Sequence, residues 1–190
     1  MERWPALELA STIRHDGDGG VADDLATPQS TTDWLRRQDV TGVTVDERLR
    51  SEIVELRRAV RALFAQAVSP APPSRADAHR LMPADQALDH LNAAAARDPI
   101  VPQLEWPPDG PPRTRVRSAE PSAEARLIAM LARAAIDFLS GPQRERLRAC
   151  HAPRCVRYFV QSHGRQEWCK PSCGNRARAA RHYQRHHAKP

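Results

Sequence analysis

The sequence has 190 residues, 17 of them proline, with an aromatic content of only 5% and a formal net charge of +6. This length suffices for one ordinary domain, or for a modest domain joined to a small module. No run of eighteen apolar residues occurs, and residues 1–20 carry acidic side chains without a long apolar core, so we predict no membrane span, no secretory signal and a cytoplasmic location.

The N-terminal part predicts two short helices separated by a loop. Residues 6–13, ALELASTI, form an apolar opening that can begin a helix, and residues 15–20, HDGDGG, follow as a loop. A brief helix is predicted over residues 30–38, with Ser30 or Thr31 as the residue that caps its first turn.

The clearest periodicity runs over residues 46–68. Apolar side chains recur there at alternating steps of four and three, which is the pattern of one buried face of an amphipathic helix. The residues of this stripe are Leu49, Ile53, Leu56, Val60, Leu63 and Ala67. Asp46 and Glu47 suit the positive N-terminal end of the helix, and the segment SPAPPS ends it.

Two more helices flank a predicted β-hairpin. The first covers residues 83–96 and places Leu88, Leu91 and Ala95 on one side. The extended segments IVPQLEW and RTRVRS, joined by the turn PPDGPP, then predict the hairpin. The second helix covers residues 121–139 and ends at the segment SGP.

The part of the chain before residue 142 carries none of the local motifs that indicate catalysis. It has no glycine-rich phosphate loop, no GxSxG, no HExxH and no pair of carboxylates that can be placed on a shared face. We therefore expect no enzyme, and we interpret residues 1–141 as a packed helical scaffold.

The cysteines are concentrated at the other end. All four lie in the last 41 residues, in the spacing C-x4-C, thirteen residues, C-x3-C, as Cys150, Cys155, Cys169 and Cys173. Two pairs of thiolates can surround one tetrahedral zinc ion, and the segment between the pairs is expected to form a hairpin that brings them together. Zinc would supply much of the folding energy of so small a module.

Other uses of these thiols fit less well. Disulfides are rare in a cytosolic chain, the C-x-x-C of thioredoxin-like centres is missing, and the spacing matches neither common ferredoxin pattern. His182 and His186 lie four apart and are alternative ligands, but Cys169 and Cys173 are nearer in the chain to the first cysteine pair. We therefore predict one zinc per chain, held by the four cysteines.

The positive charge is concentrated beside these cysteines. Residues 144–190 contain 12 Lys and Arg against two acidic residues, whereas the rest of the chain has a net charge of −4. A helix is predicted to begin near Cys173, where its N-terminus favours a thiolate, and to continue through NRARAARHYQRHH. One side of it carries Arg178, Arg181, His182 and Arg185. This side could bind the groove or the backbone of a nucleic acid. The alternative is that the arginines are only solvated and that the knuckle serves protein contacts.

Residues around Cys173 are expected to support the metal loop. Gly174 would let the backbone turn tightly around the sulfur, and Trp168 would add aromatic mass to a miniature core. Arg176 points to the opposite side from the basic stripe and would brace the loop through backbone hydrogen bonds. The predicted fold is therefore mainly α: a helical domain over 1–141 with a small β-hairpin, then over 142–190 a zinc knuckle made of a short hairpin and a basic helix.

The segment CHAPRCVRYFVQSHGRQEWCKPSCGNRARAARHYQRH resembles the CGNR zinc fingers. The residues that give the family its name stand here as Cys173, Gly174, Asn175 and Arg176. The resemblance aligns the four cysteine ligands of such fingers with the four cysteines of this chain, and it adds Asn175 to the residues expected to support the finger.

The usual companion of such a finger is an N-terminal ABATE-type domain, mostly helical and of about this length. Its opening is often L-D-L-x-N-T, from which LELAST departs by placing Ser11 where asparagine is usual. The resemblance implies a bacterial, stress-related transcription regulator with a DNA-binding zinc finger. In our leading interpretation the body senses a small-molecule ligand or mediates homodimerisation. A zinc-stabilised adaptor that binds protein or RNA is the alternative.

Overall fold

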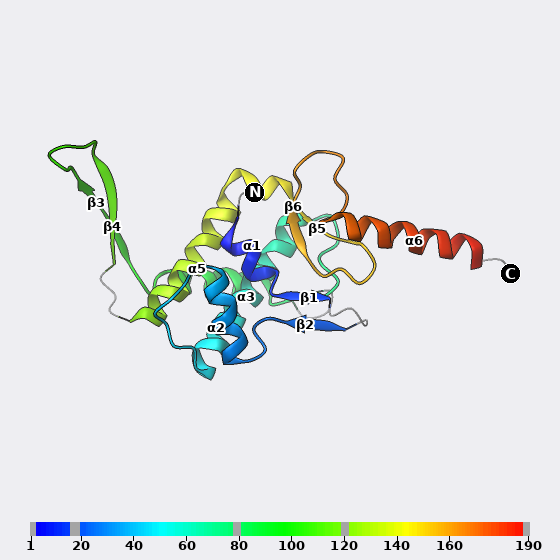
Figure 1. The fold of residues 1–190 in the computed structure, drawn as a ribbon, viewed down its shortest axis with the longest axis horizontal. Coiled ribbons are helices and arrows are strands. Elements are labelled where there is room, and N and C mark those ends of the chain that lie inside the picture. The colour runs from blue at the N-terminus through cyan, green and yellow to red at the C-terminus, as the bar shows by residue number, and fades with distance from the viewer. Residues whose placement is uncertain (1–2, 16–19, 78–80, 119–121, 188–190) are drawn as a thin grey trace.

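The computed structural model describes residues 3–15, 20–77, 81–118 and 122–187 (Figure 1). Among these residues, no helix is long and apolar enough to cross a membrane. The elements in chain order are α1 (Pro5–Ala10), β1 (Ile13–His15), β2 (Val21–Asp23), α2 (Pro28–Arg37), α3 (Glu47–Val68), α4 (Ala84–Ala95), β3 (Ile100–Glu105), β4 (Arg113–Ser118), α5 (Ala123–Ser140), the 3-10 helix η1 (Pro142–Arg146), β5 (Leu147–Ala149), β6 (Tyr158–Val160) and α6 (Pro171–His187).

Helix α3 forms the centre of the body, with α1, α4 and α5 packed around it. It begins where expected, because the Asp46 carboxylate accepts a hydrogen bond of 2.7 Å from the backbone N–H of Leu49. The predicted apolar stripe is buried from Leu49 to Leu63, and Ala67 is partly buried. Phe64 extends the stripe, with its ring centroid 5.1 Å from that of Phe138 on α5.

Two local expectations about helices were wrong. Helix α2 is capped by Thr27 rather than by Ser30 or Thr31, because Thr27 and Ser30 each accept from the other's backbone N–H at 3.1 Å and Pro28 suits the first helical position. On α4, the predicted apolar side with Leu88, Leu91 and Ala95 is not the buried face, because Leu88 is 50% exposed. The buried face is formed instead by Ala87, Leu91 and Ala94, whose small alanines let the helix backbone approach the core.

The strands form three antiparallel pairs. The predicted hairpin is confirmed as β3–β4, which projects from the body and exposes Leu104 and Val116 (Figure 1). The pairing of β1 with β2 was not predicted, and it flanks the expected loop at 15–20, of which residues 16–19 lie outside the described part of the chain. The third pair, β5 with β6, belongs to the cysteine region.

The body and the cysteine region share one core. Leu147, Ala149 and Tyr158 from the β5–β6 pair pack in the same buried cluster as the side chains of α1, α3 and α5. The Tyr158 ring meets that of Phe64 edge to face, with centroids 5.5 Å apart. The apolar core therefore extends past residue 142, where we placed the boundary between the two predicted domains.

A buried ion pair reinforces this junction. Arg61 on α3 is 2% exposed and donates to both carboxylate oxygens of Asp77 at 2.8 and 3.0 Å. The same guanidinium donates to the carbonyls of Ala10 and Val156. The Tyr158 hydroxyl donates to Asp77 at 2.7 Å, and burial together with this carboxylate raises the pKa of Tyr158 above its usual range, so the phenol remains a donor.

We predict that Asp77→Ala lowers the free energy of unfolding by about 3–5 kcal/mol, because it leaves the charge of Arg61 buried without a partner. Urea unfolding followed by circular dichroism measures this loss. Glu55→Ala is the control, since it breaks the exposed Arg58–Glu55 pair and should cost less than about 1 kcal/mol. Equal losses in the two variants would show that the buried pair contributes no more to the free energy of unfolding than the exposed pair does.

Candidate metal centre

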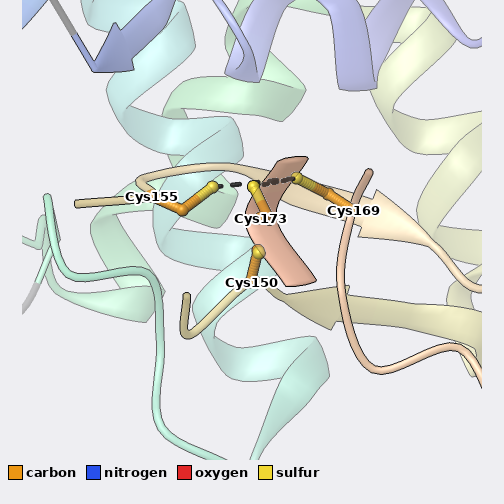
Figure 2. Close-up of side chains that lie close together, drawn as sticks. All are labelled: Cys150, Cys155, Cys169 and Cys173. Carbon is orange, nitrogen blue, oxygen red and sulfur yellow. Dashed lines mark hydrogen bonds between the residues drawn. The ribbon is translucent and has the colours of Figure 1, made fainter. Parts of the chain in front are cut away.

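The four cysteines converge from three points of the chain. Cys150 directly follows β5, Cys155 lies in the turn before β6, and Cys169 precedes α6, whose first turn contains Cys173. Their sulfur atoms all lie within 4.8 Å of one another (Figure 2). Cys155 and Cys169 are 3.7 Å apart at sulfur, and Cys169 and Cys173 are 3.5 Å apart.

These separations fit one zinc ion and do not fit disulfides. A disulfide needs sulfur atoms about 2.05 Å apart. Four thiolates at about 2.3 Å from a tetrahedral zinc ion lie about 3.8 Å from one another. Cys150, Cys155 and Cys173 are buried, and Ala152, Phe159 and Trp168 pack around the cluster. The centre accommodates one zinc ion, and four protein ligands leave no open position on it, so its role is structural.

The thiols also influence each other's protonation. Hydrogen bonds with Cys150 and then Cys169 lower the pKa of the Cys155 thiol, while hydrogen bonds with Cys150 and then Cys155 raise the pKa of Cys169. The Arg176 guanidinium lies 3.2 Å from the sulfur of Cys173, so a positive charge adjoins the cluster. A zinc ion bound by the four sulfur atoms would displace their protons and neutralise the negative charge of the thiolates.

The hairpin of this region differs from the expected one. We predicted that the segment between the two cysteine pairs would fold on itself, but its strand β6 pairs back with β5, which precedes Cys150. The first cysteine pair therefore lies in the turn of the β5–β6 hairpin, closed by a hydrogen bond of 2.9 Å from Cys150 N–H to the Arg157 carbonyl. Arg154 takes a left-handed φ of 62° in this turn.

The residues expected to support the finger are placed as follows. Arg176 braces the metal loop as predicted, because its Nε donates to the Pro153 carbonyl at 3.1 Å. The expected role of Gly174 was wrong, since it lies within α6 and not in a turn. A Cβ there would stand 3.0 Å from Cδ1 of Trp168, so the glycine makes room for this indole. Asn175 is exposed, and its side-chain oxygen accepts from Arg178.

The basic stripe is exposed on α6, which projects from the body as a separate rod (Figure 1). Arg178, Arg181, His182 and Arg185 line one shallow surface hollow, so they share a side as predicted. The rings of His182 and His186 lie 4.2 Å apart on the helix surface. Neither histidine belongs to the cysteine cluster.

Sequence reasoning missed a second basic site at the foot of α6. A notch of about 330 Å³ is lined there by Cys155 and by the positively charged side chains of Arg14, Arg157, Lys170 and Arg176. These residues come from β1, from the turn before β6 and from the residues around the start of α6. No local pattern could have found the notch, because the fold alone brings its distant segments together.

We predict that Cys169→Ser reduces the zinc content well below one per chain while α1 to α5 keep most of the helical signal, because the body has its own apolar core. Metal analysis and far-ultraviolet circular dichroism measure the two effects. The double variant His182→Gln, His186→Gln should retain its zinc. Full zinc in a Cys150→Ser, Cys155→Ser variant would contradict a four-cysteine site.

A further prediction concerns the brace. Arg176→Ala removes the hydrogen bonds to Cys173 and Pro153, so zinc affinity measured by competition with a chelator should fall by about 10–100-fold. Arg165→Ala removes an equal charge from an exposed loop position and should leave the affinity unchanged. The same affinity in both variants would mean that the brace does not act on the metal.

Comparison with known proteins agrees with this architecture. A family model named ABATE, with the description "Putative stress-induced transcription regulator", matches residues 4–142. A second model, the CGNR zinc finger, matches residues 146–186. No curated protein matches the sequence. Since the first model covers more than half of the sequence, and the second contains all four cysteines, the chain belongs to the ABATE family and carries a C-terminal CGNR zinc finger.

Proposed function

We propose that this protein is a zinc-dependent DNA-binding regulator of transcription, with α6 as the element that contacts DNA. The observation that carries the proposal is the projection of α6 from the knuckle with its arginine side uncovered. The segment Pro171–His187 contains no acidic residue that would repel phosphates. An α-helix of this diameter fits the major groove of B-DNA.

The knuckle gives this helix a fixed starting point. Cys173 lies in the first turn of α6, and Arg176 ties that turn to the Pro153 carbonyl in the first cysteine loop. Zinc bound to Cys173 would therefore set the direction in which the arginines project. Because phosphate recognition depends on placing several charges at once, a fixed helix loses less entropy on binding than a flexible tail does.

The notch at the foot of α6 supports the same proposal. Arg14, Arg157 and Lys170 add positive charge where the helix leaves the body. The cationic surface therefore extends from the stripe of α6 back to the start of the helix. Contacts to the DNA backbone from this notch would position the helix without reading sequence. In this proposal the protein has no catalytic step, and the body senses a ligand or mediates dimerisation.

The test replaces Arg178, Arg181 and Arg185 together by alanine. Loss of three phosphate contacts should weaken binding to all duplex sequences alike and flatten the plot of log affinity against log salt by about one unit per contact. Fluorescence anisotropy with duplex DNA across a salt series measures both quantities. Zinc content and circular dichroism confirm that the variant remains folded.

The matched control removes three arginines from the other end of the molecule. Arg113, Arg115 and Arg117 lie on β4, in the projecting hairpin, and their replacement changes the net charge by the same amount. This control should retain most of the affinity. If the α6 variant keeps both affinity and salt slope, the stripe is a solvated face and the adaptor function, for protein or RNA, is favoured instead.

A further inference from the structure

Four arginines line a cavity in the body. It has a volume of about 680 Å³, within the range of small-molecule sites, and lies between the β1–β2 pair, α3 and the segment that contains Asp77. Its charged lining residues are Arg57, Arg58, Arg61, Arg75, Asp23 and Asp77. Ile13 and Val21 add an apolar wall. Asp23, Glu55 and Asp77 pair with Arg57, Arg58 and Arg61, which leaves Arg75 as the lining arginine without an ion pair among the described residues.

The four arginines differ in how many ion pairs and hydrogen bonds they make within the protein. Arg61 is fully engaged by Asp77 and by backbone carbonyls, and Arg58 pairs with Glu55 at 2.8 Å. Arg75 is exposed at the cavity and forms no ion pair within the described part of the chain. Its guanidinium is therefore available to a ligand without loss of an existing contact.

Arg57 supplies a second, independent indication. It is 4% exposed, and its terminal nitrogens donate to both oxygens of Asp23 and to the Thr12 hydroxyl. Its Nε is buried and has no hydrogen-bond partner among the described residues. A buried charged donor without an acceptor is unfavourable, and Arg57 lines the cavity, so an anion bound there would meet a guanidinium whose hydrogen bonding is incomplete.

We propose that this cavity binds a small organic dianion, either a phosphate monoester or a dicarboxylate. The planar guanidinium of Arg75 would donate hydrogen bonds to two oxygens of the dianion. Arg57 would complete the site from the side of α3. The carbon skeleton of the ligand would lie against Ile13 and Val21. The proposal deepens the sensing role proposed for the body and rests on the proposed function for that role alone.

Hydrogen bonds connect this cavity to the zinc centre. Arg61 follows Arg57 by one helical turn, lines the same cavity, and donates to the carbonyl of Val156, which adjoins Cys155. Asp77 lines the cavity too and accepts from Tyr158 on β6. A ligand that fixes these side chains therefore also fixes the segment that presents Cys155, and zinc release should become slower.

The experiment uses the full zinc-loaded chain. Glycerol 3-phosphate, succinate and inorganic phosphate are titrated at constant ionic strength, with glycerol as the uncharged control. Calorimetry measures binding, and a chromogenic chelator reports the rate of zinc transfer. We expect saturable binding of at least one organic dianion, and transfer about tenfold slower at about ten times its Kd. The preferred probe shows whether the site takes a phosphoryl group or a dicarboxylate.

Variants locate the site. Arg75→Ala changes an exposed side chain, so it should fold normally and weaken dianion binding by about tenfold, whereas Arg115→Ala on the β3–β4 hairpin should not. Equal affinity in both variants, or no saturable binding by any probe, overturns the proposal. Neither measurement uses DNA, so a failure of this site is distinguishable from a failure of the proposed DNA binding.

Discussion

The buried Arg61–Asp77 pair is the contact on which the arrangement of this protein depends. Removing two charges from water is unfavourable unless hydrogen bonds satisfy both, and here they are satisfied by segments that are distant in sequence. Arg61 reaches α1 through the Ala10 carbonyl and the cysteine region through Val156, while Asp77 accepts from Tyr158. The pair therefore selects the one arrangement in which the N-terminal helix, the central helix and the zinc finger meet.

Two different forces thus organise the C-terminal region. Zinc would organise the inside of the knuckle, where the four sulfur atoms lie within 4.8 Å of one another. The ion pair, with Leu147 and Tyr158 in the main core, fixes the knuckle against the body. Beyond its first turns α6 projects from the body (Figure 1), and Arg178, Arg181 and Arg185 on it are exposed. An exposed helix that carries several positive charges is complementary to a partner of opposite charge.

The sequence revealed what is local and periodic. The apolar stripe of α3 and the zinc site predicted from the cysteine spacing follow from rules that act over a few residues. The buried stripe and the cluster of four cysteines are both confirmed. The pairing of β6 with β5 was hidden, because the partner strand lies outside the segment that the cysteines delimit. The Arg61–Asp77 pair and the notch that joins Arg14 to Lys170 were equally hidden, since each depends on distant segments meeting in the fold. Residue type showed that arginine is abundant, but not which arginines are buried.

Burial divides the arginines of this chain into two chemical groups. Arg178, Arg181 and Arg185 on α6 remain in water, where screening by salt weakens each contact and where several would have to act together on a regular array of phosphates. Arg57 and Arg61 are withdrawn from water and already paired with carboxylates, so their side chains are held in fixed positions within the fold. Arg61 also donates to the carbonyl of Val156, which follows Cys155. The buried arginines are therefore connected through the zinc finger to the arginines of α6. In the functions that we propose, an arginine-rich composition would therefore serve both a surface for a nucleic acid and an internal site for a metabolite-sized anion.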